Sequence, residues 1–356
     1  MISDRIRSLR SAPHFPIAFM LVLVLSGSAA TYGGTQPTEN GMVLGREAYK
    51  NTLSYEEWFQ RAFGEGSRNP IDPPVDLQKA HAYFSPALYR SLDGADDVTV
   101  TRIVYASDGL RIKGFIVAPK RQDHPLPVVV WCRGGIADFG MVTTGDLAIM
   151  SNWARRGYIT VASQYRGSTG SEGHDEEGGS DVHDVLALIQ MARQMPEADA
   201  ANIFLYGYSR GGMMAYEVLA TDAPVRAAVI NSGVSDFRDL SNRPDAKEFD
   251  ALMQTAIPNY ANEKAHGFYS RSAVQWPEKI HVPLLILHCT ADWRVRPSQA
   301  LHMALALQEA KRPYDLIMIS GGVHVYLDGN QKALDSKILD YFDLHLKHQE
   351  THIPQP

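Results

Sequence analysis

Cysteine and excess positive charge are both scarce in this chain of 356 residues, and each scarcity excludes a class of protein. Two cysteines are too few for a small scaffold held together by disulfides. Lysine and arginine number 34 against 40 aspartate and glutamate, which gives a formal charge of −6, whereas nucleic-acid-binding proteins usually carry a basic excess. The chain has no internal repeat and no low-complexity tract. Because 45% of its residues are hydrophobic and 21% are charged, we expect an ordinary globular protein with no nucleic-acid partner.

Long apolar runs are scarce too, and the longest lies near the N-terminus, at residues 15–25. A run of this length is shorter than the ~20 residues that cross a bilayer. Positive charges precede it and small residues follow it, namely Arg5, Arg7, Arg10, Ser28 and Ala30. This pattern predicts a secretory signal peptide over residues 1–30, and hence a periplasmic or secreted protein with no stable membrane partner. The alternative is an uncleaved signal that anchors the protein in the membrane.

The two cysteines, Cys132 and Cys289, each end an apolar, strand-like run. The strand order expected below separates these runs by three positions, or about 14 Å at ~4.8 Å per strand. The Cα atoms of a disulfide must lie within about 7 Å of each other. The sequence therefore predicts two buried thiols with no bridge between them.

The pattern of the chain changes near residue 97. Residues 31–96 form a lead-in, of which 31–50 are predicted to be poorly ordered and 51–93 contain short helical patterns broken by prolines. Residues 98–105 and 112–118 then alternate polar and apolar side chains on either side of a Ser-Asp-Gly turn. This alternation predicts an antiparallel hairpin.

Strand-like and helix-like segments alternate along the rest of the chain. Uninterrupted apolar runs typical of buried strands lie at 128–132, 159–163, 203–206, 227–230, 284–287 and 316–319. Helical stretches lie at 146–156, 181–195, 213–220, 298–309 and 331–348. Buried strands alternating with amphipathic helices predict an α/β domain over residues 97–348, with a mostly parallel central sheet flanked by helices.

The alternation is interrupted over residues 235–280, which we expect to form a small lid over a site at the strand ends. The aromatic residues of this insertion either shape a pocket or form the core of the lid. They are Phe237, Phe249, Tyr260, Phe268, Tyr269 and Trp276.

The sharpest local signal is Gly207-Tyr208-Ser209-Arg210-Gly211-Gly212, directly after an apolar strand and before a helix. A strand-to-helix turn this tight strains the backbone at its centre, so that small residues must flank it. The Ser209 hydroxyl would be exposed there, next to the N–H groups of the following helix. This placement predicts a serine nucleophile.

A serine nucleophile needs a base and a carboxylate that orients the base. Asp292 follows the strand-like run at 284–287, and His324 follows the run at 316–319. The order Ser, Asp, His is the one that this type of turn requires, and all three residues lie at carboxyl ends of strands. His288, within an apolar run, is interpreted as a satisfied core residue.

A second group of polar residues lies at 174–183, where His174 and His183 flank the acidic run 175–177. Its spacing matches no metal-ligand motif. We therefore expect a solvated acidic loop, and no metal or other cofactor.

Together these residues resemble the α/β-hydrolase superfamily and, within it, the catalytic domain of the prolyl oligopeptidase family of serine peptidases. The matching segments are 165–170, 207–212, the segment from Asp292 to 297 and the Gly-Val-His324 segment, within roughly residues 97–347. The resemblance implies that Ser209 is the nucleophile, Asp292 the orienting acid and His324 the general base.

The sequence departs from the family in two places. Relatives that carry a β-propeller before this domain need roughly 300 residues for it, and residues 31–96 are too few. In the loop after the run at 128–132, the family commonly has an aromatic residue or histidine before two glycines, whereas this chain has Arg133-Gly134-Gly135. The side-chain hydroxyl that some relatives direct at the oxyanion is therefore missing.

The oxyanion hole must then be built differently. We expect one donor from the backbone N–H of Arg210. The second comes from the backbone of Gly134 and Gly135 or from the guanidinium of Arg133. The alternative for Arg133 is a salt bridge to Asp138 or to another acidic neighbour.

The predicted function is hydrolysis of amide bonds in short peptides through an acyl-enzyme, with no cofactor. An ester hydrolase of the same fold remains an alternative, because esters are easier to cleave than amides. A more remote alternative is an inactive hydrolase fold used as a binding module.

Overall fold

The computed structural model describes residues 39–64, 77–92, 96–242, 246–325 and 331–347. The predicted signal peptide, residues 1–30, lies outside these ranges. Among the helices within them, none has the length and apolar character needed to span a membrane.

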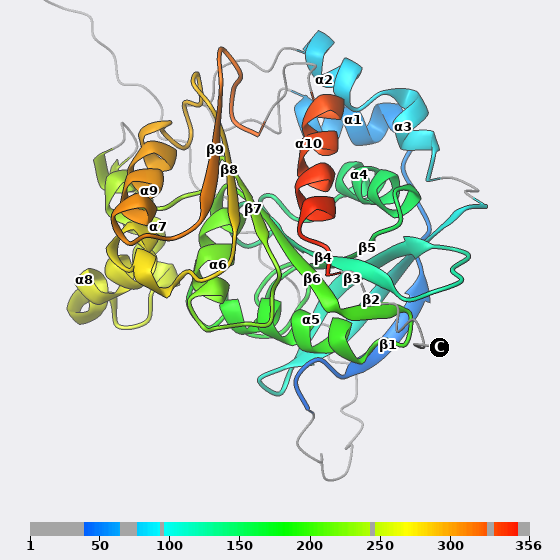
Figure 1. The fold of residues 1–356 in the computed structure, drawn as a ribbon, viewed down its shortest axis with the longest axis horizontal. Coiled ribbons are helices and arrows are strands. Elements are labelled where there is room, and N and C mark those ends of the chain that lie inside the picture. Colours follow the sequence, from blue (N-terminus) through cyan, green and yellow to red (C-terminus); the bar gives the residue numbers. More distant parts are fainter. Residues whose placement is uncertain (1–38, 65–76, 93–95, 243–245, 326–330, 348–356) are drawn as a thin grey trace, which may run out of the picture. The chain divides into compact units, whose positions relative to one another are not determined.

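One nine-stranded sheet forms the centre of the fold, in the order β1-β2-β3-β5-β4-β6-β7-β8-β9 (Figure 1). β1, β2 and β3 run antiparallel to their neighbours, and all pairs from β5 to β9 are parallel. The mostly parallel sheet with a leading hairpin is therefore confirmed. The strands are β1 Val43–Ala48, β2 Val98–Ser107, β3 Leu110–Pro119, β4 Leu126–Cys132, β5 Ile159–Ser163, β6 Ala198–Tyr208, β7 Ala228–Asn231, β8 Leu284–Cys289 and β9 Tyr314–Ile319.

Helices cover both faces of the sheet, because strands such as β5 and β8 are buried along their whole length and leave no polar face for water. α5, α6 and α9 pack into the core on one face, and α4 and α10 pack into the core on the other. These helices are α4 Thr144–Arg155, α5 Val182–Gln194, α6 Arg210–Leu219, α9 Ser298–Glu309 and α10 Gln331–Leu344.

β1 is a correction to the sequence prediction, which made residues 31–50 a poorly ordered lead-in. Val43–Ala48 instead pairs with β2 and forms the edge of the sheet. As an edge strand, β1 pairs with another strand on one side only, and none of its residues is fully buried. Its sequence therefore lacks the alternation of apolar residues from which a strand is predicted. The pairing depends on the open edge of β2, which is remote in sequence.

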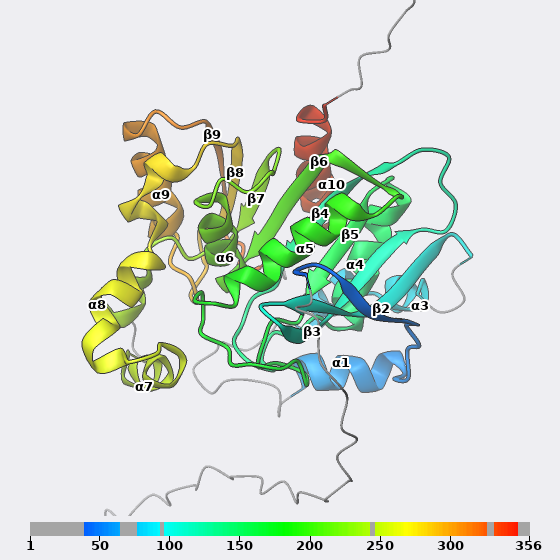
Figure 2. The ribbon, with the colours of Figure 1, turned by 90° about the horizontal axis from the view of Figure 1, so that it is seen from below.

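The short helical patterns of the lead-in form a cluster of their own. Tyr55, Trp58 and Phe59 of α1 pack with Ala80 and Tyr89 from the two following helices. In Figures 1 and 2 these helices lie on the opposite side from α7 and α8. Their bounds are α1 Tyr55–Phe63, α2 Leu77–Tyr83 and α3 Pro86–Arg90.

The predicted insertion between β7 and β8 is helical and has its own core. Phe237 and Phe268 are buried there, with Phe249 and Tyr260 packed against them. Trp276 belongs to the main core instead, and Tyr269 is exposed. Most of the aromatic residues thus form the core of the insertion, which was the second of the two alternatives drawn from the sequence. Its elements are η2 Phe237–Asn242, α7 Ala246–Ala256, α8 Tyr260–Ser270, η3 Ala273–Gln275 and η4 Pro277–Lys279.

Cys132 ends β4 and Cys289 ends β8, three positions apart in the sheet. Both side chains are buried and no disulfide joins them. This prediction is confirmed, and burial raises the pKa of the Cys132 thiol to about 12.

Candidate active site

Ser209 lies at the turn between β6 and α6, in a backbone conformation that is rare for a residue with a side chain. Its φ is 56° and its ψ is −126°. The turn is tight enough that a Cβ on Gly207 would lie 2.2 Å from the carbonyl oxygen of Gly211. A Cβ on Gly211 would lie 2.0 Å from the carbonyl oxygen of Cys132. These two glycines are required by close backbone approach, and the strain they permit presents the Ser209 side chain beyond the sheet edge.

Three loops bring Ser209, His324 and Asp292 together at the carboxyl ends of β6, β9 and β8. Nε2 of His324 lies 3.1 Å from Oγ of Ser209, and Nδ1 of His324 lies 2.9 Å from Oδ2 of Asp292. An ionised carboxylate can only accept, so Nδ1 carries the proton and Nε2 is the acceptor for the Ser209 hydroxyl. The geometry therefore links hydroxyl, imidazole and carboxylate in one hydrogen-bonded chain.

Asp292 remains ionised although it is buried. Burial alone would raise its pKa, but His324, a contact from His288 and backbone N–H groups together hold the pKa well below the usual range. The backbone N–H groups of Arg294 and Val295 both donate to its Oδ1 at 2.9 Å. The second oxygen is left for His324.

His288 is buried, as predicted for a core residue, and its Nε2 donates to the carbonyl oxygen of Val295 at 2.9 Å. The same nitrogen lies 3.3 Å from Oδ2 of Asp292. Sequence reasoning missed this contact, although the spacing of four residues around a strand end was a usable signal. His288 therefore helps to orient the carboxylate.

Arg133, in the loop after β4, does not have its guanidinium in the predicted place. The group is completely buried and donates to backbone carbonyl oxygens of its own loop and of Gln164, and to the hydroxyl of Ser168. Its hydrogen bonds are thus committed to holding the loop, and it forms no ion pair with Asp138 among the described residues. Neither sequence interpretation of Arg133 matches this arrangement, because a long side chain with five N–H donors finds carbonyl acceptors that only the folded loop provides.

Arg210, directly after Ser209, has a buried side chain that contacts three carboxylates. Its guanidinium donates to both oxygens of Asp175 at 2.6 and 2.8 Å, and pairs with Asp181 and Glu177. Burial lowers its pKa, but the three carboxylates outweigh burial and raise that pKa above the ordinary value. The sequence prediction of a solvated acidic loop at 175–177 is therefore wrong, because a remote arginine draws Asp175 into the interior.

The same network connects the turn at Ser209 to the loop after β4. Nη1 of Arg210 donates to the carbonyl oxygen of Gly135 at 2.7 Å, and Asp175 accepts from the backbone N–H of Ala137 at 2.8 Å. Gly134 lies against Ser209, since a Cβ added to Gly134 would be 3.1 Å from the Cβ of Ser209. The predicted oxyanion residues are thus neighbours of Ser209.

Across the residues that the structure describes, no group of three or more His, Cys, Asp or Glu side chains is arranged to hold a metal ion.

Comparison with known proteins now decides the family. The sequence profile of the prolyl oligopeptidase family matches residues 146–349, which contain Ser209, Asp292 and His324. The chain belongs to the prolyl oligopeptidase family. It is a hydrolase of the serine peptidase type, as predicted. This family member is 26% identical over 231 residues to the uncharacterized peptidase YtmA of Bacillus subtilis, covering 64% of this chain and 87% of that protein.

Solved structures agree with this family member in fold. Pyrococcus horikoshii acylaminoacyl peptidase superposes with a TM-score of 0.61 at 21% identity, over 73% of this chain and 44% of that chain. An acetyl xylan esterase from Paenibacillus sp. R4 superposes with a TM-score of 0.57 at 18% identity, over 78% of this chain and 96% of that chain. This family member therefore spans less than half of the acylaminoacyl peptidase but nearly all of the esterase.

Proposed function

We propose that this member of the prolyl oligopeptidase family hydrolyses amide bonds of short peptides through an acyl-enzyme on Ser209. The observation that carries the proposal is the continuous chain of hydrogen bonds from Ser209 through His324 to Asp292. The strained conformation of Ser209 adds support, because such strain is found where a side chain must be held for chemistry. Family membership supplies the peptide substrate class.

In the first half of the reaction, Oγ of Ser209 attacks the carbonyl carbon while Nε2 of His324 takes the hydroxyl proton. The C–O bond forms, the carbonyl π electrons move to oxygen, and Asp292 stabilises the imidazolium. His324 then gives its proton to the leaving amine as the C–N bond breaks. In the second half, water repeats both steps and frees the acid.

The oxyanion is assigned to backbone donors. No described residue accepts a hydrogen bond from the N–H of Gly135 or of Arg210, and both lie in the segments that flank Ser209. The N–H of Gly134 belongs to the same loop. Because the guanidinium of Arg133 is used on carbonyl oxygens, we assign it a supporting role in this hole.

The test is a paired assay on the full chain. Xaa-Pro and N-acylated aminoacyl anilides measure amidase activity, and short-chain p-nitrophenyl esters measure esterase activity. The proposal expects amidase activity, covalent labelling by a fluorophosphonate, and loss of both in Ser209→Ala, by about 10⁶-fold in kcat for a residue of this kind. A Ser209→Ala chain that keeps its amidase activity overturns the assignment.

Ester hydrolysis is the second candidate, favoured by the full-length match to the acetyl xylan esterase fold. Ester turnover without amide turnover in the same assay would establish it. An inactive binding module would instead show neither turnover nor labelling.

Export is a separate proposal, which rests on the charge and hydropathy pattern of residues 1–30. Expression of the full chain in a bacterial host, followed by fractionation and N-terminal sequencing, tests it. Cleavage near Ala30 and a periplasmic product are expected. A full-length product in the membrane fraction would show the anchored alternative.

A further inference from the structure

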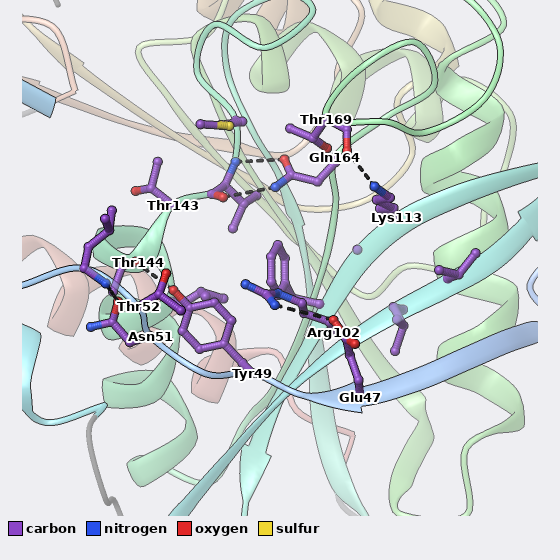
Figure 3. Close-up of a pocket in the computed structure, with 18 of the residues that line it drawn as sticks. Glu47, Tyr49, Asn51, Thr52, Arg102, Lys113, Thr143, Thr144, Gln164 and Thr169 are labelled. Carbon is purple, nitrogen blue, oxygen red and sulfur yellow. Dashed lines mark hydrogen bonds and ion pairs between the residues drawn. The ribbon is translucent and has the colours of Figure 1, made fainter. Parts of the chain in front are cut away.

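A cavity of about 720 Å³ lies between the outer strands β1 to β3, the helix α1 and the start of α4 (Figure 3). Its lining includes Tyr49, Trp58, Phe115 and Val142, but none of Ser209, Asp292 or His324. Cavities of 300–1,000 Å³ are the usual size for small-molecule sites. The active-site chemistry does not account for this cavity.

Hydrogen bonds hold the walls of the cavity in place. The hydroxyl of Tyr49 lies 2.7 Å from Oγ1 of Thr144, so β1 is joined to the start of α4. The side-chain amide of Gln164 makes two bonds to the backbone of Val142, at 2.9 and 3.0 Å. Figure 3 shows these contacts on the rim of an open space. The site is therefore largely formed before any ligand binds.

The interior is apolar, and two of the residues that line it each have one buried polar atom without a partner among the described residues. Trp58 is 4% exposed, and its indole N–H has no acceptor among the described residues. The buried hydroxyl of Thr169 also has no partner in that part of the chain. An indole N–H can only donate.

The charges around the cavity are mostly positive, although the whole chain is acidic. Four cationic side chains line it against one carboxylate, Glu47; the cations are Arg46, Arg61, Arg102 and Lys113. Glu47 already pairs with Arg102 at 3.4 Å. The guanidinium of Arg102 also lies 4.8 Å from the centre of the Tyr49 ring, at the boundary between the apolar interior and the charged edge. The cavity thus combines an apolar interior with an excess of positive charge.

We propose that this cavity binds an amphipathic carboxylate, a linear aliphatic acid with a body of about ten carbons. The aliphatic chain occupies the space lined by Trp58, Phe115 and Val142. The carboxylate lies at the edge with Arg102 and Lys113. This binding is independent of the proposed hydrolysis, because none of Ser209, Asp292 and His324 lines the cavity.

Calorimetric titration of the full chain with decanoate, kept below its micelle concentration, tests the proposal. Decyltrimethylammonium has the same tail length and the opposite charge, and acetate has the head group alone. We expect saturable one-site binding of decanoate, at least tenfold weaker binding of decyltrimethylammonium and none of acetate. The Ser209→Ala chain is expected to bind decanoate equally well, which separates this site from the active site.

A variant that fills the cavity gives the sharpest test. Gly45 and Val104 both line it, and a Cβ on Gly45 meets nothing nearer than the Cβ of Val104 at 4.0 Å. The Cβ of Gly45→Leu therefore fits without a clash, and decanoate binding is expected to weaken at least tenfold while the melting temperature is maintained.

A charge variant keeps the test decisive even if Gly45→Leu misfolds. Arg102→Gln should weaken decanoate binding about threefold to tenfold. Arg111→Gln is the matched control, because Arg111 is an exposed cation of β3 outside the cavity and its removal should leave binding unchanged. Equal binding of decanoate and decyltrimethylammonium, no binding of decanoate, or unchanged binding in both folded variants would each overturn the proposal.

Discussion

Two arginines bracket the candidate active site, and their surroundings differ. Arg133 follows β4 and Arg210 follows β6, and both guanidinium groups lie over the ring of Tyr165, at 4.7 and 5.1 Å from its centre. Arg133 binds neutral acceptors, whereas Arg210 binds the carboxylates of Asp175 and its neighbours.

The difference shows that one residue type can hold a loop in two physically distinct ways. Burial and the nearby Arg210 lower the pKa of Arg133, while the carboxylates around Arg210 raise the pKa of Arg210. The loop after β4 is held by carbonyl hydrogen bonds that do not titrate. The turn after β6 is held by ion pairs, and its stability should therefore depend on which carboxyls are ionised.

Arg210→Met should have the largest effect. It leaves Asp175 and Asp181 buried without their cation, and breaking a buried ion pair in this way costs about 3–5 kcal/mol. The free energy of unfolding in urea measures this loss. Arg155→Met is the control, because Arg155 pairs with Asp97 at the surface and such pairs contribute about 0–1 kcal/mol. Equal losses in the two variants would contradict the role given to Arg210.

Asp175→Asn should act on catalysis. Asp175 joins Arg210 to the backbone N–H of Ala137, so its loss loosens the loop beside Ser209. We expect kcat to fall about tenfold to a hundredfold with KM nearly unchanged, because small misplacements of a site are costly. Asp181→Asn is the matched control: Asp181 also contacts Arg210 but binds the backbone of Gly178 and Gly179 rather than this loop, and kcat should stay within about threefold of wild type. A normal kcat in Asp175→Asn would show that the two loops are not coupled.

Arg133→Met should act mainly on stability. It leaves the buried carbonyl oxygen of Gln164 without its donor, at a cost of about 1–3 kcal/mol. Unfolding in urea and steady-state kinetics measure the two effects side by side. If kcat fell by 10²–10³, as it does when an oxyanion donor is lost, the guanidinium would be a donor after all.

Stability should also depend on pH through Glu177. Burial raises the pKa of Glu177 to about 7 despite the attraction of Arg210, whereas a carboxyl in an unfolded chain titrates near 4.3. Between these values the folded state binds more protons than the unfolded state, so this carboxyl makes stability fall as pH rises from about 4.5 to 7 and leaves it level above.

Urea unfolding of wild type and Glu177→Gln over this pH range tests whether Glu177 causes this pH dependence of stability. The difference in the free energy of unfolding between wild type and Glu177→Gln should change between about pH 4.5 and 7 and be constant above pH 7. Arg133→Met should keep the wild-type slope, because none of its acceptors titrates there. A constant difference between wild type and Glu177→Gln would mean that Glu177 is ionised throughout.

The sequence predicted the sheet, its leading hairpin and the turn at Ser209, because these depend on local features: unbroken apolar runs, alternation about a turn, and glycines around one serine. Their positions directly after strand-like runs also placed Asp292 and His324 correctly, at the carboxyl edge of the sheet. The structure brings both within hydrogen-bond distance of their expected neighbours, and their catalytic roles stay a prediction. β1 was missed because its partner β2 is remote in sequence, and the contact of His288 with Asp292 was missed although the two residues are only four apart.

The charged residues show the same difference between what local sequence determines and what folding determines. By itself the sequence determined an acidic chain with an α/β fold, since fold class follows from the period of apolar residues along the chain. Only the tertiary structure decided where the charges go. It buries Arg133 on carbonyl oxygens, draws Asp175 onto Arg210, and gathers four cations around a cavity in an otherwise acidic chain. A long charged side chain reaches many acceptors, and the cost of burying its charge is met only by those that folding brings close.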